Sequence, residues 1–439
     1  MNMKDTICAL ASGAGRAAIA VIRVSGPATG EILRAICGLP EARRASLRTL
    51  RDPRTEMPLD RGLVVWFPAP ASFTGEDMAE LHVHGGRAVV ASVIDAVLSI
   101  DNARLAEPGE FAFRAFENGK LDLTEVEGLA DLINAETDAQ ARQALAQAGG
   151  SLRTLYEAWR AQLLRAQALT EAGLDFADEA DVTANVATGA NSIVIGLINQ
   201  IATHLADKSG ERLRDGFHVI IAGAPNAGKS SLLNALARRD IAIVSEEAGT
   251  TRDTIEVHLD LDDLPVILTD TAGLRRAGGK VEAEGIRRAL ARAEAADLVL
   301  WLIDASKPVS APPEPLARGQ APILPVRNKI DLVPVSAAEG VSLSARTGQG
   351  IDTLVAELKA RAREAMARGV ESPVVTRARH RTELEAAVSS LRRYTEPGLP
   401  EELKAEELRA ASRHLGRLTG HVDVDEVLGA IFSEFCIGK

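Results

Sequence analysis

Cysteine is scarce in this chain of 439 residues, which contains only Cys8, Cys37 and Cys436. Three widely separated thiols suit neither a disulfide framework nor a zinc cluster, and such sparse use is typical of a reducing compartment. No apolar run reaches the length needed to span a membrane, and residues 1–26 lack the apolar core and cleavage site of a secretion signal. The sequence therefore predicts a cytoplasmic protein.

An excess of positive charge is also missing, because 50 Lys and Arg face 61 Asp and Glu, for a formal net charge of −11. That balance argues against broad electrostatic coating of nucleic acid. A local basic run leaves two alternatives open, a small nucleic-acid patch or, more often for such runs, a solvated face; it comprises Arg377, Arg379, His380 and Arg381. No repeat of roughly 20 to 50 residues is visible, so a solenoid is not expected.

The pattern of apolar residues changes along the chain, which at this length predicts several domains. Strand-like runs (AIAVIRV, GLVVWF, AELHVH) and a helical segment (RAVVASVIDAVLS) predict an α+β domain over residues 1–118. Helical periodicity over residues 119–213 and 366–439 predicts one all-helical domain split in two. Between them, FHVIIAG opens an alternation of strands and helices, which predicts an inserted α/β domain over residues 214–365.

The strongest functional signal is GAPNAGKS, Gly223 to Ser230, which fits the pattern G-x-x-x-x-G-K-[ST]. It follows the strand-like run FHVIIAG and precedes the helical segment SSLLNALARR. In such a loop, glycines let backbone N–H groups surround the phosphates at a helix N-terminus. Lys229 supplies positive charge to the outer phosphates, and Ser230 offers a hydroxyl to Mg²⁺.

Three further motifs indicate the nucleotide. DTAG, Asp270 to Gly273, follows the apolar run VILT and brings a carboxylate near Mg²⁺ and a glycine amide near the terminal phosphate. NKID ends another strand-like run, and its Asp331 carboxylate can accept both guanine N1–H and the exocyclic amine, which adenine cannot match. SAR, Ser344 to Arg346, would support the base. These motifs resemble the translation-factor-like class of P-loop GTPases in order and spacing, so GTP is expected rather than ATP.

The chain lacks the glutamine that orients the attacking water in Ras-like enzymes, because Leu274 follows DTAG. Another group must therefore hold that water and neutralise the developing charge. GTTRD contains Thr251, a switch threonine suited to Mg²⁺ once the loop closes. Asn226 has two equally supported interpretations: it turns a carbonyl oxygen towards a monovalent cation in the place of an arginine finger, or it only shapes the loop.

Together with these motifs, four segments resemble the bacterial MnmE (TrmE) family of tRNA-modification GTPases, so that the resemblance runs from end to end: DTICALASGAGRAAIAVIRVSG, FTGEDMAELHVHGG, EPGEFAFRAFENGKLDLTEVEGLADLI and FCIGK. The resemblance implies an N-terminal α+β domain similar to folate-binding aminomethyltransferases, an all-helical domain split by a Ras-like α/β GTPase domain, and a homodimer formed through the N-terminal domains. It also implies that, with the flavoprotein MnmG, the protein adds an aminomethyl or carboxymethylaminomethyl group to carbon 5 of the wobble uridine of certain tRNAs.

The resemblance further assigns ligands to residues. It gives K⁺ to Asn226, Ser245, Glu247 and Thr250, and Mg²⁺ to Ser230 and Thr251. It gives the one-carbon donor, methylene- or formyl-tetrahydrofolate, to Arg23, Glu80, Lys120 and Lys439. It assigns the attacking water to Glu282, which composition alone makes a solvated helix carboxylate. The predicted nucleotide contacts are Asn226, Ala227, Gly228, Lys229, Ser230, Ser231, Ser245, Glu246, Glu247, Ala248, Gly249, Thr250, Thr251, Asp270, Thr271, Ala272, Gly273, Asn328, Lys329, Asp331, Ser344, Ala345 and Arg346.

The chain departs from the family's usual pattern in several places. Residues 15–23 read GRAAIAVIR where GRGGIGIVR is common, so a close backbone approach there is expected to be lost or rearranged. Glu247 replaces an apolar residue, although a backbone carbonyl would serve the ion equally. Pro325 removes a hydrogen-bond donor from the strand before NKID. His82 and His84 share one strand face, where a polar or structural role is favoured over a metal site.

Cys436 keeps two interpretations. A C-a-a-X lipid signal fits its position, but Lys439 at the end and the absence of a polybasic segment argue against prenylation. Beside the folate pocket the thiol would be a nucleophile or redox group, whereas in an apolar tail it would be structural. The candidate catalytic residues are thus Lys229, Glu282 and Cys436.

Two rival functions are weaker than a potassium-stimulated GTPase that gates tRNA modification. A ribosome-assembly switch of this class often carries a KH module, and this chain contains no glycine pair with the G-x-x-G spacing of that module. A folate enzyme with a merely structural GTPase domain is the other rival, and the intact nucleotide motifs argue against it.

Overall fold

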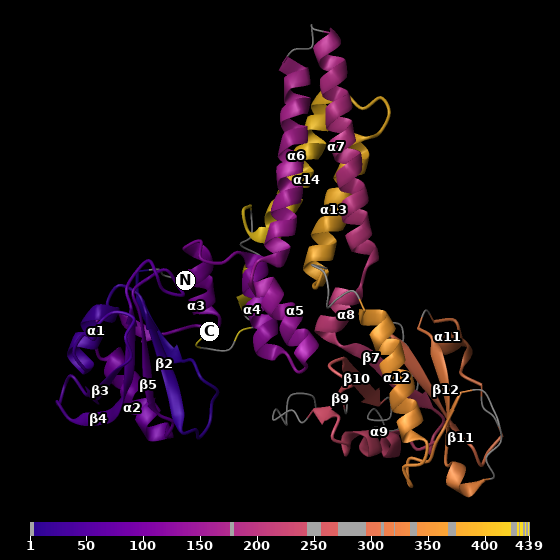
Figure 1. Ribbon diagram of the computed structural model, residues 1–439, viewed down its shortest axis with the longest axis horizontal. Helices are drawn as coiled ribbons and strands as arrows, with labels where there is room; N and C mark the ends of the chain where they lie inside the picture. The colour runs from indigo at the N-terminus through magenta and orange to yellow at the C-terminus, as the bar shows by residue number, and fades with distance from the viewer. Residues whose placement is uncertain are drawn as a thin grey trace, which may run out of the picture. The chain divides into compact units, whose positions relative to one another are not determined.

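The computed structural model of the protein describes residues 4–175, 180–243, 256–270, 296–308, 311–319, 321–333, 340–367, 375–422, 428–429, 431–432, 435 and 438 (Figure 1). The chain forms two compact units. The first consists of Met1–Ala130, Ala148–Arg160 and Arg413–Lys439, and the second of Asp131–Gln147 and Ala161–Ser412. Within the described ranges, no helix is both long and apolar enough to cross a bilayer.

The first unit contains a six-stranded sheet in the order β3-β4-β5-β2-β1-β6. Its strands are β1 (Thr6–Leu10), β2 (Ile19–Ser25), β3 (Ser46–Arg51), β4 (Pro58–Phe67), β5 (Met78–His84) and β6 (Ala103–Leu105). Neighbouring strands are antiparallel except for the parallel pair β1 and β6. The three runs that predicted strands lie in β2, β4 and β5, which confirms the α+β class of this region.

Helices cover one face of this sheet. Side chains alternate between the two faces of a strand, so every second residue points towards these helices. Helices α1 (Thr29–Ile36) and α2 (Arg87–Leu98) pack on the face that carries Ile22, Leu81 and Val64. All three side chains are completely buried. The helix predicted from RAVVASVIDAVLS is α2 and is confirmed.

The opposite face of the sheet remains open over part of its width. Ile19 on β2, Leu47 on β3 and Leu63 on β4 are exposed by 61%, 57% and 44%. Leu47 and Leu63 are direct cross-strand partners, so their side chains share this face. Near β1 the face is covered, since Phe111 packs there on Ile7. An exposed apolar face of this kind was not apparent from the sequence.

Helices dominate the chain after the first sheet and return after the second. They are α3 (Glu110–Glu117), α4 (Leu123–Asn134), α5 (Asp138–Ala148), α6 (Ser151–Asp175), α7 (Ala180–Ala206), α8 (Ser209–Asp215), α13 (Ala378–Tyr394) and α14 (Glu401–Thr419). Helix α7 precedes the second sheet and α13 follows it, yet the two pack side by side (Figure 1). Leu197 and Ile201 on α7 and Leu384 and Leu391 on α13 are completely buried.

The second sheet has seven strands in the order β13-β12-β11-β7-β10-β9-β8. They are β7 (Phe217–Gly223), β8 (Ala242–Ile243), β9 (Glu256–Asp260), β10 (Pro265–Asp270), β11 (Leu298–Asp304), β12 (Ile323–Asn328) and β13 (Val341–Ser342). The central strands β12, β11, β7 and β10 run parallel. A parallel sheet with alternating helices is the arrangement predicted for an α/β nucleotide-binding fold, and the strand expected from FHVIIAG is β7.

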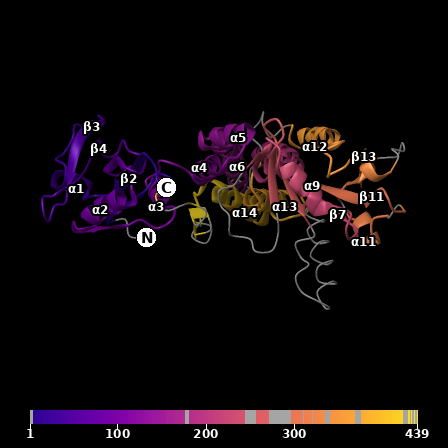
Figure 2. The same ribbon diagram turned by 90° about the horizontal axis from the view of Figure 1, so that it is seen from below.

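Helices lie on both faces of the second sheet. Helices α9 (Lys229–Ala237) and α12 (Ile351–Met366) pack on the face that carries Val219. The short helix α11 (Glu314–Ala317) packs on the face that carries Trp301. Figure 2 shows α12 and α11 on opposite sides of the strands. The multidomain α+β and α/β class is therefore confirmed.

Pro325 lies in β12, as the sequence indicated, with Trp301 of β11 as its cross-strand partner. The pairing between β12 and β13 begins one residue later, at Val326 and Val341. The missing N–H of Pro325 therefore removes no bond from the β13 side, because that strand is short and has not yet begun there.

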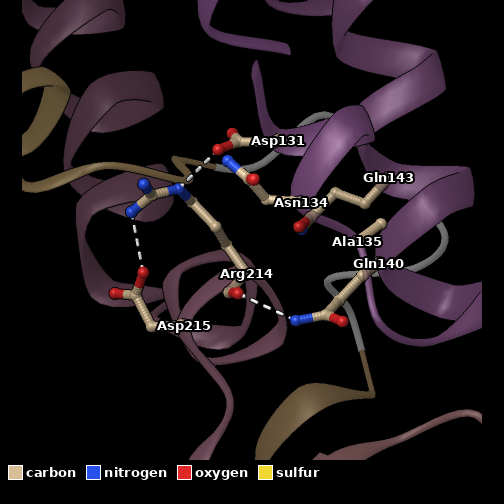
Figure 3. A pocket seen from close by; sticks show the side chains of 7 residues that line it. All are labelled: Asp131, Asn134, Ala135, Gln140, Gln143, Arg214 and Asp215. Atoms are coloured by element: carbon tan, nitrogen blue, oxygen red, sulfur yellow. Dashed lines mark hydrogen bonds and ion pairs between the residues drawn. The ribbon is translucent and has the colours of Figure 1, made fainter. Parts of the chain in front are cut away.

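Asp131 of α4 accepts hydrogen bonds from two arginines, one before and one after the second sheet in the chain. Figure 3 shows the contact with Arg214. Arg214 Nε on α8 and Arg377 Nη2 at the start of α13 lie 2.9 and 2.7 Å from the same oxygen, Oδ1. Gln140 Nε2 of α5 donates to the carbonyl of Arg214 at 3.0 Å. Arg214 also pairs with Asp215 at 2.7 Å. The chain is thus fixed to one carboxylate just before and just after the α/β part.

Both interpretations of the basic run are therefore wrong. Arg377 is 7% exposed, His380 is completely buried, and Arg381 forms an ion pair with Glu211 of α8 at 2.7 Å. Arg377 and Arg381 bind carboxylates supplied by segments far away in the sequence, which a local charge pattern does not reveal.

Candidate functional site

The loop between β7 and α9 has the conformation of a phosphate loop, and two of its glycines tolerate no side chain. Gly223 and Gly228 have φ values of +155° and +96°, a range that L-residues rarely adopt. A Cβ on Gly223 would collide with the carbonyl oxygen of Leu302, and one on Gly228 would collide with the Asn328 amide. The close approach of these two neighbours explains why the loop needs glycine at both positions.

Lys229 and Ser230 begin α9, whose N-terminal N–H groups favour an anion. Lys229 Nζ donates to the carbonyl oxygens of Gly223 and Ala224 at 2.9 and 3.1 Å. Ser230 Oγ donates to Oδ2 of Asp270, at the end of β10, at 2.8 Å. Asp270 is 1% exposed. The hydroxyl and the carboxylate expected near Mg²⁺ are thus neighbours, and both offer the oxygen ligands that this ion prefers.

Asn328 connects three of the predicted segments. Its Nδ2 donates to the carbonyl of Ala227 in the phosphate loop at 2.8 Å. Its Oδ1 accepts the N–H groups of Lys329 and Ala345 at 2.8 and 2.9 Å. Asn328 is 2% exposed, so these bonds replace water for both ends of its amide.

Lys329 adds a second link from this segment to the phosphate loop. Its Nζ donates to the carbonyl of Asn226 and to Oδ2 of Asp304, at 2.7 Å in each case. The Lys329 hydrogen bond, followed by that of Ser306, lowers the pKa of Asp304 to about 2. Sequence reasoning missed Asp304. Its signal was its place at the end of the apolar run LVLWLID, because the carboxyl ends of parallel strands meet at one edge.

Asp331 is held as a carboxylate by the neighbouring SAR segment. Ser344 Oγ donates to its Oδ1 at 2.6 Å, and Arg346 contacts its Oδ2. The Ser344 hydrogen bond is the main reason why the pKa of Asp331 lies below its usual value. An ionised carboxylate is the acceptor that the two N–H groups on one edge of guanine require.

Asn226 has a φ of +64°, a left-handed conformation that asparagine adopts more readily than most residues. This supports the loop-shaping interpretation and leaves the cation interpretation untested. The remaining predicted nucleotide and catalytic residues lie outside the described residues: Ser245, Glu246, Glu247, Ala248, Gly249, Thr250, Thr251, Thr271, Ala272, Gly273 and Glu282.

Arg23 and Glu80, predicted to act together, are cross-strand partners on β2 and β5. Nη2 and Nε of Arg23 lie 2.9 and 3.3 Å from the same oxygen of Glu80, Oε1. The Arg23 guanidinium also lies 5.4 Å from the ring centre of Phe73 and 5.8 Å from that of Phe111, within the range of cation–π attraction. Lys120 is exposed.

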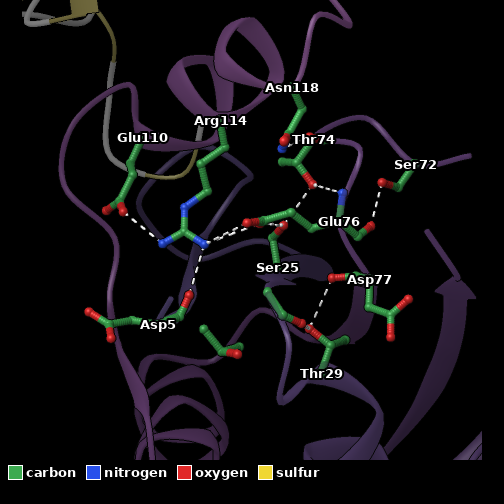
Figure 4. A network of polar contacts seen from close by, with 12 residues as sticks. Asp5, Ser25, Thr29, Ser72, Thr74, Glu76, Asp77, Glu110, Arg114 and Asn118 are labelled. Atoms are coloured by element: carbon green, nitrogen blue, oxygen red, sulfur yellow. Dashed lines mark hydrogen bonds and ion pairs between the residues drawn. The ribbon is translucent and has the colours of Figure 1, made fainter. Parts of the chain in front are cut away.

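A buried polar network fixes the loop that carries Phe73 (Figure 4). Arg114 of α3 donates to the two oxygens of Glu76 at 3.1 Å each and to Glu110 at 3.0 Å. Burial favours a raised pKa for Glu110, but hydrogen bonds from Arg104, from the N–H of Glu107 and from Arg114 outweigh it and lower that pKa. The side chains of Arg114 and Glu110 are completely buried, so the loop at Glu76 is anchored from within the domain.

The loop also adjoins the segment that ends at Lys120. Asn118 Nδ2 donates to the carbonyl of Thr74 at 2.7 Å. A Cβ on Gly75 would lie 3.4 Å from Cγ of Lys120. Lys120 therefore lies next to the same loop as Phe73. The fourth predicted folate residue, Lys439, lies outside the described residues.

Residues 15–23, where the chain departs from the family's usual pattern, include a residue whose backbone approaches another segment closely. Ala17 and Gly85 approach so closely that a Cβ on Gly85 would collide with the Ala17 carbonyl. Gly85 belongs to HVHGG rather than to the altered segment. The alanine at position 17 is therefore compatible with this approach, since its partner supplies the glycine.

Two of the three cysteines are poor nucleophiles. Burial raises the pKa of Cys8 to about 12, and burial raises the pKa of Cys37 to about 11 despite the opposing charge of Arg48. The thiolate is the reactive form, so both thiols are inert at neutral pH. Cys436 lies outside the described residues, and its two interpretations stay open.

His82 and His84 point to the same face of β5 but contact different carboxylates. His84 Nδ1 lies 2.8 Å from Asp60, whereas His82 Nε2 lies 3.4 Å from Oε2 of Glu80. Among the described residues, no group of three or more His, Cys, Asp or Glu side chains is arranged to hold a metal ion.

Comparison with known proteins identifies relatives over the whole chain. The model described as the MnmE helical domain matches residues 123–436, and the model described as the GTP-binding protein TrmE N-terminus matches residues 6–120. The chain is 54% identical to the tRNA modification GTPase MnmE of Parvibaculum lavamentivorans, over 99% of this chain and 100% of the relative. It is 53% identical to the tRNA modification GTPase MnmE of Paramagnetospirillum magneticum, over 100% of both chains.

Among solved structures, the chain is similar to the G domain of the T. maritima FeoB iron transporter at 24% identity. The match covers 34% of this chain and 97% of that chain, with a TM-score of 0.25. A score this low supports no functional argument.

Proposed function

The chain belongs to the MnmE family of tRNA modification GTPases, and we propose that it is a potassium-dependent GTPase that acts with MnmG on the wobble uridine of certain tRNAs. It binds GTP and hydrolyses it to GDP and phosphate in the course of tRNA modification. The proposed product carries an aminomethyl or carboxymethylaminomethyl group on carbon 5. The observation that carries the proposal of GTP binding is the 2.7 Å hydrogen bond from Lys329 Nζ to the Asn226 carbonyl. This bond joins the NKID segment, which is predicted to bind guanine, to the phosphate loop.

The described residues support separate roles in binding the phosphates, the guanine base and Mg²⁺. Lys229 and the N–H groups at the start of α9 bind the phosphates, and Asp331 accepts the two N–H groups of guanine. Ser230 and Thr251 would hold Mg²⁺, which neutralises charge on the β- and γ-phosphates. The Ser230–Asp270 bond of 2.8 Å supports this role, because it brings two oxygen donors together beside the phosphate loop.

In this proposal a K⁺ ion and the side chain of Glu282 together replace the missing glutamine. Asn226, Ser245, Glu247 and Thr250 would hold K⁺, which supplies positive charge where an arginine finger would otherwise stand. Their donor atoms are oxygens, the type that hard cations prefer. Glu282 would orient the attacking water.

The proposed one-carbon site lies on the first sheet. Arg23, Glu80, Lys120 and Lys439 would hold methylene- or formyl-tetrahydrofolate, whose glutamate tail suits cations and whose pterin edge suits a carboxylate. The Arg23–Glu80 pair supports this assignment, since its two bonds to one oxygen leave the other oxygen of Glu80 for a ligand. Gly438 packs against Leu10 at the end of β1, so the tail reaches the neighbourhood of Arg23 within this unit.

A homodimer through the N-terminal domains is proposed from the open face of the first sheet. Leu47 and Leu63 expose apolar surface on the neighbouring strands β3 and β4, and Ile19 does so on β2, beyond β5. Exposed apolar surface on a folded domain is typical of an interface. A second copy of the chain is the occupant proposed here, since the family resemblance predicts dimerisation through this domain.

The proposed domain boundaries remain 1–118, 119–213, 214–365 and 366–439. They are supported by α8 ending at Asp215, β7 beginning at Phe217 and α12 ending at Met366. We place the protein in the cytoplasm, where tRNA is modified.

Three measurements test the proposal. Nucleoside analysis of tRNA from cells lacking this protein should show loss of the modified wobble uridine, and a normal nucleoside profile would exclude the modification role. GTP turnover should be faster in KCl than in NaCl at equal ionic strength. Equal rates in the two salts would contradict the role of K⁺. Wild-type turnover by Glu282→Ala would contradict the role of Glu282 in orienting the attacking water.

A further inference from the structure

His82 occupies a position on the first sheet that the proposed function does not yet use. On β5 it follows Glu80 by two residues, so both side chains point to the open face of the sheet. Its cross-strand partners are Val21 on β2 and Leu63 on β4. The imidazole therefore lies beside the proposed one-carbon site, with apolar neighbours on both sides.

The two oxygens of Glu80 have different surroundings. Oε1 accepts both hydrogen bonds from Arg23, at 2.9 and 3.3 Å. Oε2 lies 3.4 Å from Nε2 of His82, in an orientation that does not make a hydrogen bond. Nε2 is shielded from solvent and has no hydrogen-bond partner among the described residues. An acceptor and an imidazole nitrogen thus stand side by side, each with capacity for a ligand atom.

A shielded polar nitrogen without a partner is destabilising, and a ligand that supplies the missing hydrogen bond removes this cost. His84 shows the contrast on the same strand. Its Nδ1 lies 2.8 Å from Asp60, and 72% of its side chain is exposed, so it is satisfied without a ligand. The side chain of His82 is only 32% exposed.

We infer that His82 is a specificity-determining residue of the one-carbon site and that it reads the 4-oxo group of the pterin. The inference rests on the proposed folate function. A pterin presents N3–H and C4=O next to each other on one edge. Glu80 Oε2 accepts from N3–H, and His82 Nε2–H donates to C4=O. An analogue with an amino group at C4 places a donor against this donor, and a site built to hydrogen-bond one group rejects the analogue that cannot.

The test compares tetrahydrofolate with 4-amino-4-deoxytetrahydrofolate, which carries an amino group in place of the 4-oxo group and has no N3–H, each bound to the full-length protein at pH 8. Dissociation constants are measured by calorimetry for wild type and for His82→Leu, His82→Gln and His84→Leu. His82→Leu should weaken tetrahydrofolate binding about tenfold and leave the amino analogue nearly unchanged. The ratio of the two dissociation constants should therefore shift about tenfold towards the analogue.

Two variants separate recognition from structure. His82→Gln retains an N–H donor near the position of Nε2 and should restore most of the preference. His84→Leu removes the other histidine of the strand and should leave the ratio unchanged. If His82→Leu weakens both ligands equally, or if the ratio does not change, His82 does not read the 4-oxo group while the folate assignment stands. If wild type binds neither ligand, the folate assignment fails and this inference falls with it.

Discussion

Glu211 of α8 and Arg381 of α13 form a bidentate ion pair, with Nε 2.9 Å from Oε1 and Nη2 2.7 Å from Oε2. Helix α8 ends just before β7, the first strand of the second sheet in the chain, and α13 follows α12, the last helix that packs on that sheet. Arg381 Nη1 also donates to the carbonyl of Leu205 at 2.6 Å. The pair therefore joins the two places where the chain passes into and out of the α/β part.

Replacing Glu211 with glutamine should lower the free energy of unfolding by about 1–3 kcal/mol, because Arg381 keeps its charge in a place where only 17% of its side chain is exposed. Urea denaturation followed by circular dichroism measures the loss. Glu314→Gln is the matched control, since its ion pair with Arg318 is a surface pair and should change stability by less than about 0.5 kcal/mol. Equal losses of unfolding free energy in the two variants would show that the bidentate pair stabilises the fold no more than a surface ion pair does.

Asp331→Asn should change the preferred base. The amide presents one N–H donor in place of an acceptor, which opposes guanine N1–H or its exocyclic amine but suits the C2 oxygen of xanthine. GTP affinity should fall roughly 100-fold, and XTP should become the better ligand. Fluorescent-nucleotide titration measures both affinities, with Asp352→Asn as a control at an aspartate whose side chain is 87% exposed. Unchanged GTP binding by Asp331→Asn would remove this residue from the base site.

Gly438→Ala should loosen the C-terminal tail from β1. Gly438 has a φ of +102°, and a Cβ there would collide with the carbonyl of Leu10. Because Ala9 of β1 pairs with Arg23, we expect the variant to bind reduced folate several-fold more weakly and to be cleaved sooner by a C-terminal exopeptidase. Gly429→Ala is the control, since no atom lies within 4 Å of a Cβ built there. Identical behaviour of the two variants would rule out the docking role.

The stability contributed by Asp304 should depend on pH in a defined direction. Its pKa falls from 3.8 to about 2 in the folded protein, so its contribution is complete above about pH 4 and is lost as the pH falls towards 2. The difference in unfolding free energy between wild type and Asp304→Asn should therefore be constant from about pH 7 to 5 and shrink below about pH 4. The exposed Asp101→Asn serves as control. A difference that grows on acidification would contradict the Lys329 pairing.

The elements of the nucleotide site were predictable because their signals are local. The glycines, Lys229 and Ser230 follow a strand and begin a helix, and chain order alone brings Asp270 and Asn328 to the same edge of a parallel sheet. Resemblance to a family singled out Arg23 and Glu80, which composition would have left as surface charges; they are cross-strand partners, and their folate role stays a prediction.

Other features depend on partners that the sequence does not announce. Asp304 is one carboxylate at the end of an apolar strand, and only the fold brings Lys329 to it. The basic run at Arg377 was misread because its counter-charges lie on α4 and α8, far away in the chain. The open face of the first sheet was missed because alternation predicts two faces without saying which one a helix covers.

The double attachment at Asp131 has a mechanical consequence. A domain connected through one flexible linker can rotate about any axis. A domain whose two linkers are both fixed can rotate freely only about the line that joins the two points of attachment. Arg214 and Arg377 are those points of attachment, and they share one carboxylate oxygen. A displacement of the second sheet that preserves both of these hydrogen bonds is thereby restricted to a narrow set of directions.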